Sequence, residues 1–142
     1  MNSDAIPGAI EPTSREDLEA ITAVARDYIE SWLDGDGGRM RRCLHPELVK
    51  RTIVRDPASA DWRLGRPADA EIMVHWTREG EGRTAIPRER AFEIVVEDAF
   101  RHIASVKVLS YPYMDYLHVA KLGERWLIVN VLWELREGEE PA

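Results

Sequence analysis

Asp115 is the residue whose type and surroundings best suit chemistry. In the alternating stretch 113–119 it shares a face with Tyr113, Leu117 and Val119. A carboxylate among apolar side chains either has its pKa raised or finds a hydrogen-bond donor. Asp115 is therefore a candidate general base or ligand anchor, and the alternative is a structural hydrogen bond to a neighbouring loop or turn.

His45 and Asn130 are the next candidates. His45 precedes Pro46 at a bend between a short helix and a strand, and an imidazole titrates near neutrality. We pair His45 with Asp115 as catalytic candidates, although it could equally cap or pack. Asn130 lies in the apolar stretch 126–133, where an unsatisfied amide would cost about 1–3 kcal/mol. It could orient a ligand carbonyl, or it could bond to Asp115 or Tyr28 within the core.

Aromatic side chains are numerous enough to line a pocket for a flat, apolar ligand. Each of them could instead simply fill the core, and a buried Tyr or Trp still needs a partner for its polar tip. The predicted ligand-binding residues are Tyr28, Trp32, Trp62, Trp76, Tyr113 and Asn130.

Composition excludes several other classes of function. The net charge of -7 makes a long polyanion an unsuitable partner, and the basic cluster at 39–42 is short, so no nucleic-acid partner is predicted. Only one cysteine is present, Cys43, on the apolar side of a short helix. It permits no internal disulfide and suits a reducing, cytoplasmic location.

Metal, cofactor and membrane signals are also missing from the sequence. The histidines are scattered, and no pair has the helical spacing of a zinc protease. There is no glycine-rich phosphate loop, so we predict neither a metal nor a cofactor. No apolar run is long enough to span a bilayer, and the first residues do not resemble a signal peptide.

The elements that must position these residues are helices followed by strands. A helix capped by Thr13 and Glu16 should run to the Gly-rich stop after Leu33, followed by a short helix over 39–44 and a weak strand over 47–54. Trp62 falls in an expected loop, and Pro67 suits the start of a helix over 68–78. Alternation then predicts strands over 90–100 and 104–111.

The stretch 113–133 reads as two antiparallel strands joined at 121–124, where Gly123 supplies a flexible position. Strict alternation puts Trp126, Ile128, Asn130 and Leu132 on one face of the last strand and the residues between them on the other. Both faces are largely apolar, so this strand should lie between two layers or against a partner subunit. Helices that precede an antiparallel sheet make an α+β fold.

The chain length predicts one domain. We expect that domain over residues 13–137, with a flexible N-terminal arm over 1–12 and a C-terminal tail over 138–142.

Three stretches together resemble the nuclear transport factor 2-like superfamily, which includes ketosteroid isomerases and SnoaL-like polyketide cyclases. They are Trp32-Leu33-Asp34-Gly35-Asp36 at the end of the first helix, His45-Pro46-Glu47, and the terminal pair of strands from Asp115 to Asn130. Within the superfamily the chain is most similar to the bacterial group called putative lumazine-binding proteins. None of these stretches is a catalytic motif, so the resemblance bears on fold more than on chemistry.

The resemblance implies a cone, in which a curved antiparallel or mixed sheet wraps around a pocket that three helices close, and commonly a homodimer through the sheet. It suggests a small apolar or aromatic ligand and an isomerase, cyclase or dehydratase type of acid–base step. Two alternatives stay open, a ligand-binding protein without turnover and a protein–protein accessory that uses the sheet surface.

Overall fold

The computed structural model describes residues 11–136. The helices are α1 (Arg15–Asp34), α2 (Gly37–Cys43), α3 (Ala70–Arg78) and the 3-10 helix η1 (Pro87–Arg90). The strands are β1 (Leu44–Arg55), β2 (Trp62–Leu64), β3 (Phe92–Phe100), β4 (Ile103–Ser110), β5 (Tyr113–Leu122) and β6 (Arg125–Leu135). The tail expected over 138–142, and all but the last two residues of the expected arm, lie outside the described range.

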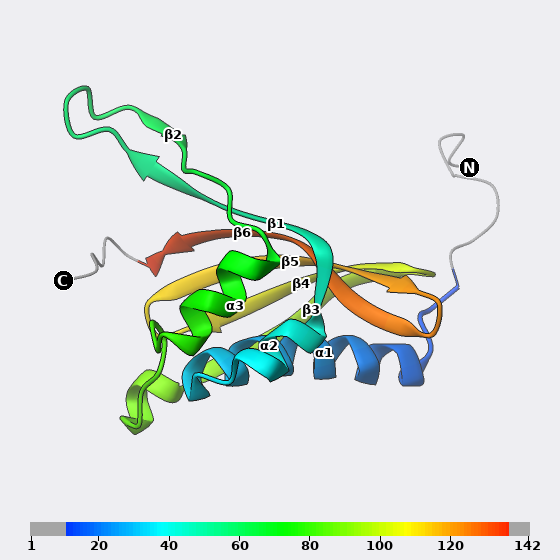
Figure 1. The fold of residues 1–142 in the computed structure, drawn as a ribbon. Coiled ribbons are helices and arrows are strands. Elements are labelled where there is room, and N and C mark those ends of the chain that lie inside the picture. The colour runs from blue at the N-terminus through cyan, green and yellow to red at the C-terminus, as the bar shows by residue number, and fades with distance from the viewer. Residues whose placement is uncertain (1–10, 137–142) are drawn as a thin grey trace, which may run out of the picture.

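The strands form one curved sheet in the order β2-β1-β6-β5-β4-β3. β1 runs parallel to β6, and the other neighbours are antiparallel. The helices lie along one side of the sheet, and the β1–β2 hairpin extends beyond them (Figure 1). The predicted α+β class is therefore confirmed, with the helices closing the inner face of the sheet.

The core fills the space between the helices and the inner face of the sheet. Apolar side chains at helical spacing on α1 and α3 meet alternate residues of the central strands. Its fully buried members include Ile21, Met40, Leu48, Met73, Val74, Val106, Leu117, Val119, Ile128 and Val131.

The cap of α1 differs from the prediction by one residue. Ser14, not Thr13, is the N-cap, and its side chain accepts a hydrogen bond from the backbone N–H of Asp17. Thr13 instead donates to the carbonyl of Ala99 on β3. At the other end, Gly35 adopts φ 71°, and the N–H of Asp36 returns to the carbonyl of Ser31 at 2.9 Å, which closes the helix as the glycine predicts.

Two predicted segments have different extents. The weak strand is a long one, Leu44–Arg55, because its edges pair with both β2 and β6. Trp62 is not in a loop but on β2, where its ring is 57% exposed and lies under the Arg55 guanidinium. In the single chain Trp62 therefore keeps most of its surface exposed, and the Arg55 guanidinium lies 5.6 Å from its ring centroid.

A β-bulge in β6 overturns the predicted face assignment of that strand. Val119 pairs with Ile128 while His118 pairs with Asn130, so Val129 is an extra residue on β6. Trp126 and Ile128 are buried on the inner face, but Asn130 and Leu132 point outward and Val131 and Trp133 take their places. One inserted residue reverses every later side chain, which alternation alone could not detect.

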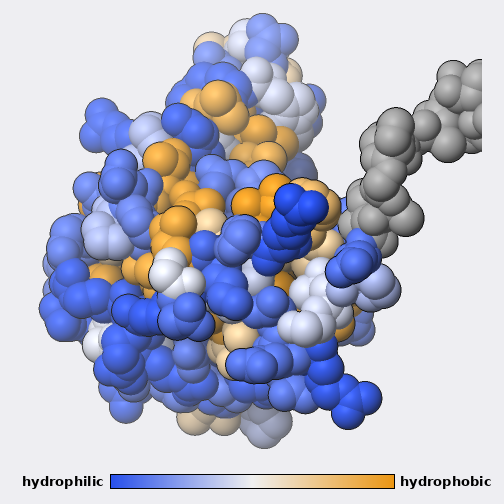
Figure 2. Space-filling model, turned by 90° about the vertical axis from the view of Figure 1, so that its right-hand side faces the viewer, coloured by the Kyte–Doolittle hydropathy of each residue, from blue (hydrophilic) through white to orange (hydrophobic). Residues whose placement is uncertain are grey.

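The outer face of the sheet keeps exposed apolar side chains. Tyr116 on β5 and Leu132 on β6 pair across the strands and are 44% and 45% exposed. Seen from one end, apolar residues gather over the upper half of the molecule, whereas the lower half is mostly hydrophilic (Figure 2). Within residues 11–136 no helix is long and apolar enough to cross a membrane.

Asp17 ties the start of α1 to the last hairpin. Its Oδ1 accepts hydrogen bonds from Trp126 Nε1 at 3.0 Å and from Lys121 Nζ at 3.1 Å. The Trp126 bond, followed by the Lys121 bond, lowers the pKa of Asp17 below its ordinary 3.8. A depressed native pKa adds stability above 3.8 that is lost as the pH falls through the native value.

We expect Asp17→Asn to lower the Tm at neutral pH and to flatten the fall of Tm on acidification, because the ionised carboxylate is what both donors need. Thermal unfolding followed by circular dichroism from neutrality to below pH 3.8 measures both effects. Glu16→Gln removes an exposed acid from the same helical turn and should leave the acid slope unchanged. Equal slopes for wild type and Asp17→Asn would contradict the role of Asp17.

Candidate functional site

A small cavity of about 70 Å³ lies between α1, α3 and the inner face of the sheet. Five of its ten lining residues are aromatic, and its polar groups come from α1, β1, β4 and β5. The lining residues are Tyr28, Ile29, Trp32, Lys50, Met73, Trp76, Ser110, Tyr113, Asp115 and Trp133.

A chain of hydrogen bonds joins three buried polar side chains at this cavity. Lys50 Nζ donates to Tyr28 Oη at 2.7 Å, and the Tyr28 hydroxyl donates to Asp115 Oδ2 at 2.7 Å. Lys50 and Asp115 are 8% and 6% exposed. An ammonium and a carboxylate buried this deeply must compensate each other, and the tyrosine hydroxyl connects them.

Backbone pairing fixes the positions of Lys50 and Asp115, the two ends of this series of hydrogen bonds. Lys50 exchanges two hydrogen bonds with Ala68, at 2.9 and 2.8 Å, on one side and is paired with Val131 of β6 on the other. Asp115 lies between Val108 of β4 and Trp133 of β6. The inner faces of β1 and β5 therefore present the two side chains toward Tyr28, which α1 carries.

Aromatic rings surround the Lys50 amine on its other sides. Nζ lies 5.2 Å from the ring centroid of Tyr28, 5.7 Å from that of Trp32 and 5.8 Å from that of Trp133. Such cation–π contacts are each worth about 0.5–2 kcal/mol. Trp133 is itself held by Tyr113, edge to face at 5.2 Å. The rings form an aromatic cage that accepts a positive charge.

Burial governs the titration of the chain. It lowers the pKa of Lys50, and the negative charge of Asp115 opposes this shift. It raises the pKa of Asp115, against the opposing effects of the Lys50 charge and the Tyr28 hydrogen bond. Burial, followed by the Asp115 charge, also raises the pKa of Tyr28 well above 10.0. The two opposite shifts bring the proton affinities of the amine and the carboxylate closer together.

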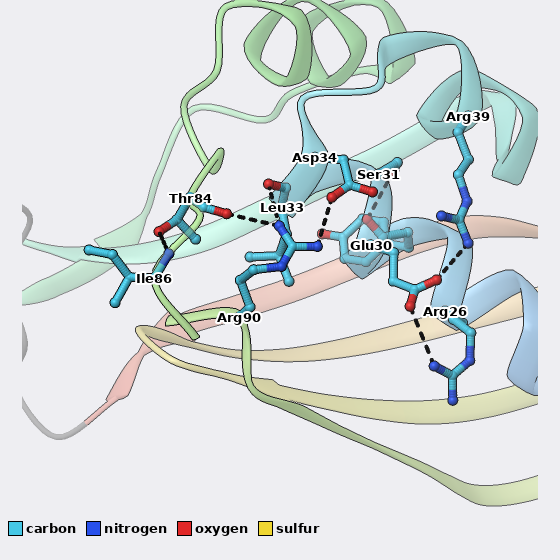
Figure 3. A network of polar contacts seen from close by, with 10 residues as sticks. Arg26, Glu30, Ser31, Leu33, Asp34, Arg39, Thr84, Ile86 and Arg90 are labelled. Atoms are coloured by element: carbon cyan, nitrogen blue, oxygen red, sulfur yellow. Dashed lines mark hydrogen bonds and ion pairs between the residues drawn. The ribbon is translucent and has the colours of Figure 1, made fainter. Parts of the chain in front are cut away.

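The loop after α3 covers Trp32. A Cβ on Gly82 would lie 1.9 Å from Trp32 Nε1, so only glycine lets this backbone approach the indole so closely. Arg90 holds the loop in place by donating to the carbonyls of Leu33 (3.0 Å) and Thr84 (2.9 Å) and to Asp34 Oδ1 (2.7 Å), as Figure 3 shows. These bonds also satisfy a terminal carbonyl of α1.

A second depression of about 160 Å³ adjoins the cavity on its solvent side. Trp32, Ser110 and Tyr113 line both spaces, and Gly82, Glu89 and Pro112 are among the other residues around the outer one. The three shared side chains form the wall through which a small molecule would pass.

The structure brings five of the predicted site residues together. Asp115 faces the cavity, as the alternation of β5 predicts, and Tyr28, Trp32, Trp76 and Tyr113 line it. The alternative for Asp115 was a structural hydrogen bond to a neighbouring loop or turn, but the hydrogen bond that its carboxylate accepts comes from Tyr28 on α1.

Three predicted site residues lie elsewhere. His45, the second residue of β1, accepts a hydrogen bond from the Glu47 N–H on its Nδ1 and does not line the cavity. Trp62 is on the projecting β1–β2 hairpin. Asn130 donates from Nδ2 to His118 Nδ1 on the outer face, not to Asp115 or Tyr28, because of the β6 bulge.

Sequence reasoning missed Lys50 and Trp133. Lys50 follows the buried Leu48 by two residues, so a strand period over 48–50 would have put it on the inner face. A lysine is nevertheless among the residues least often buried, and β1 has an irregular register between Leu44 and Val49. Trp133 was missed because the bulge in β6 reverses the direction of the side chains that follow Val129.

Other reactive groups do not add to the site. Cys43 is buried beside Met40, and burial raises the pKa of its thiol to about 12, so it is protonated at neutral pH. In the described part of the chain no cluster of His, Cys, Asp and Glu could hold a metal ion.

Solved structures with the same fold identify the class of protein. An NTF2-like protein of unknown function from Silicibacter pomeroyi matches with TM-score 0.66 and 16% identity, covering 88% of this chain and 100% of that one. One from Methylobacillus flagellatus matches with TM-score 0.66 and 20% identity, covering 91% and 99%. A ketosteroid isomerase-like protein from Erwinia carotovora matches with TM-score 0.61 and 14% identity, covering 87% and 99%. The fold is the NTF2-like α+β cone.

The family follows from the sequence. Residues 16–134 match the family model described as putative lumazine-binding, and the chain belongs to that family. The predicted resemblance is thereby confirmed. No curated protein matches the chain.

We expect Lys50→Met to lower the free energy of unfolding by about 3–5 kcal/mol at neutral pH, because it leaves the Asp115 carboxylate buried without a counter-charge. Burial raises the pKa of Asp115, so the folded protein binds this proton more tightly than the unfolded chain does, and the loss should shrink as the pH falls toward 3.8. Urea unfolding followed by tryptophan fluorescence at several pH values measures this.

Two further variants control that experiment. Lys50→Met with Asp115→Asn removes both charges and should recover part of the loss, whereas Lys107→Met changes a lysine outside the cavity and should have little effect. A double variant no more stable than Lys50→Met would show that the two charges do not compensate each other.

Proposed function

We propose that this protein binds a small, largely apolar or aromatic molecule in the cavity between α1, α3 and the sheet. The observation that carries the proposal is the hydrogen-bonded chain of Lys50, Tyr28 and Asp115 at the wall of an aromatic-lined cavity. Ligand sites typically combine apolar walls with a few convergent polar groups. The family description supports a small-molecule ligand.

The polar groups suit a ligand with one hydrogen-bonding atom. Within residues 11–136 only Tyr28 donates to the Asp115 carboxylate, on Oδ2, which leaves Oδ1 available to a ligand donor. The inner space of about 70 Å³ holds the polar end of a molecule, and the outer depression holds the rest.

Phenol, which is flat and carries one hydroxyl, should shift the backbone amide signals of residues around the cavity in a two-dimensional NMR titration. Ile29→Phe fills the cavity from α1 and should abolish these shifts, because Ile29 lines it. Leu132→Phe adds similar bulk on the outer face and should keep them. Shifts that persist in Ile29→Phe, with the variant folded, would place phenol elsewhere.

Acid–base turnover through Asp115 is a second candidate function. The observation that favours it is the burial of a carboxylate with a raised pKa at the cavity wall, which is how a general base is tuned toward neutrality. The notion that His45 assists Asp115 has less support, since His45 lies outside the cavity lining.

We expect the wild-type protein to accelerate exchange of the α-hydrogens of butanone in D2O, measured by proton NMR. Asp115→Asn should lower the protein-dependent rate constant by about 10²–10⁴, the usual contribution of a general base. Asp98→Asn, an exposed carboxylate on β3, serves as the matched control and should keep the rate. Equal rates with and without protein would leave binding without turnover.

The homodimer through the sheet and the cytoplasmic location stay predictions. The exposed Tyr116 and Leu132 on the outer face support the dimer, because large exposed apolar patches often mark interfaces. A non-catalytic accessory role through the same face is the remaining alternative.

A further inference from the structure

Lys50 is a buried amine that binding alone does not require. It is the amine that lines the cavity, whereas Lys121 pairs with Asp17 at 3.1 Å on the surface. Its stem comes from a strand paired on both sides, so Nζ has little freedom to leave. A desolvated lysine in an apolar pocket is an activated nucleophile.

We propose that Lys50 captures a small aldehyde or ketone in this cavity as a Schiff base, with Tyr28 and Asp115 moving the protons. This inference rests on the proposed function, because the carbonyl compound must enter the same cavity. It specifies the ligand class and makes the attachment covalent.

The hydrogen-bonded chain supplies the proton acceptor for the first step. Lys50 Nζ passes a proton to Tyr28 Oη while the tyrosine hydroxyl passes its own to Asp115 Oδ2, each across 2.7 Å. The ion pair thus becomes a neutral amine and a carboxylic acid. The opposite pKa shifts that burial causes in Lys50 and Asp115 favour this neutral pair.

The remaining steps balance without any other reactant. The amine lone pair forms a bond to the carbonyl carbon, the C=O π pair moves to oxygen, and one proton passes from the attacking nitrogen to that oxygen, which gives a neutral carbinolamine. Asp115 returns a proton through Tyr28 to that hydroxyl, the C–O bond breaks, and water leaves as the nitrogen lone pair forms the C=N bond. One ammonium and one carbonyl compound give one iminium and one water.

The surroundings of Nζ suit the product. The iminium keeps the positive charge where the rings of Tyr28, Trp32 and Trp133 already lie within 5.8 Å of it. The size of the inner space restricts the carbonyl end to a few atoms, and an apolar remainder would pass between Trp32 and Tyr113 into the outer depression.

The test is reductive trapping of the full chain at neutral pH with propanal and sodium cyanoborohydride, followed by peptide mapping by mass spectrometry. The lysines are Lys50, Lys107 and Lys121, so the chain contains its own comparison sites. We expect Lys50 to be propylated at least about tenfold faster than Lys107, as an activated amine should be. Preferential labelling of Lys107 would overturn the proposal.

Two variants separate chemistry from packing. Lys50→Arg keeps the positive charge but cannot form the imine, so it should lose the adduct at position 50 while Lys107 is labelled as in wild type. Asp115→Asn keeps the volume of the side chain but cannot take the proton, and it should slow trapping at Lys50 without affecting Lys107. Trapping at Lys50 that is as fast in Asp115→Asn as in wild type would remove the proton-transfer role and overturn the mechanism.

Phenol binding distinguishes a failure of the Schiff-base proposal from a failure of the proposed binding function. If phenol binds in the cavity and Lys50 is not trapped, the Schiff base is wrong and the binding function stands. If phenol does not bind and Lys50 is not trapped, both proposals fail.

Discussion

The burial of two opposite charges beneath α1 and α3 is the constraint on which the rest of the structure depends. Neither the Lys50 ammonium nor the Asp115 carboxylate could remain at this depth alone, and no direct ion pair within 4.0 Å joins them in the described residues. Tyr28 supplies the bridge, so α1 must lie where its hydroxyl reaches both strands. The position of the first helix is thereby tied to β1 and β5.

The aromatic residues complete this arrangement. Trp32 and Trp133 face the Lys50 amine, and Tyr113 meets Trp133 edge to face. Gly82 approaches Trp32 closely and Arg90 donates to the carbonyl of Leu33 at the end of α1, and these contacts hold the loop that covers Trp32. Packing and electrostatics therefore act on the same residues.

The sequence predicted the fold well and the site in part, for identifiable physical reasons. Helical spacing and strand alternation repeat along the whole length of an element. For this reason the order of elements and the inward direction of Asp115 could be predicted. A bulge breaks alternation without leaving a mark in residue types, so Asn130 and Trp133 were assigned to the wrong faces. Lys50 was overlooked because a lysine is usually exposed, and the residue type alone does not reveal the partners that allow it to be buried.

The extra residue at Val129 has a consequence for comparing this chain with its relatives. Two solved structures of the same fold share 16% and 20% identity with it, so an alignment of the last strand depends on few residues. Against a strand that lacks such a bulge, an alignment without a gap would match inward side chains of one protein with outward side chains of the other in each later column. Residues conserved in the cavity would then be assigned to the outer surface, and residues conserved on the outer surface would be assigned to the cavity.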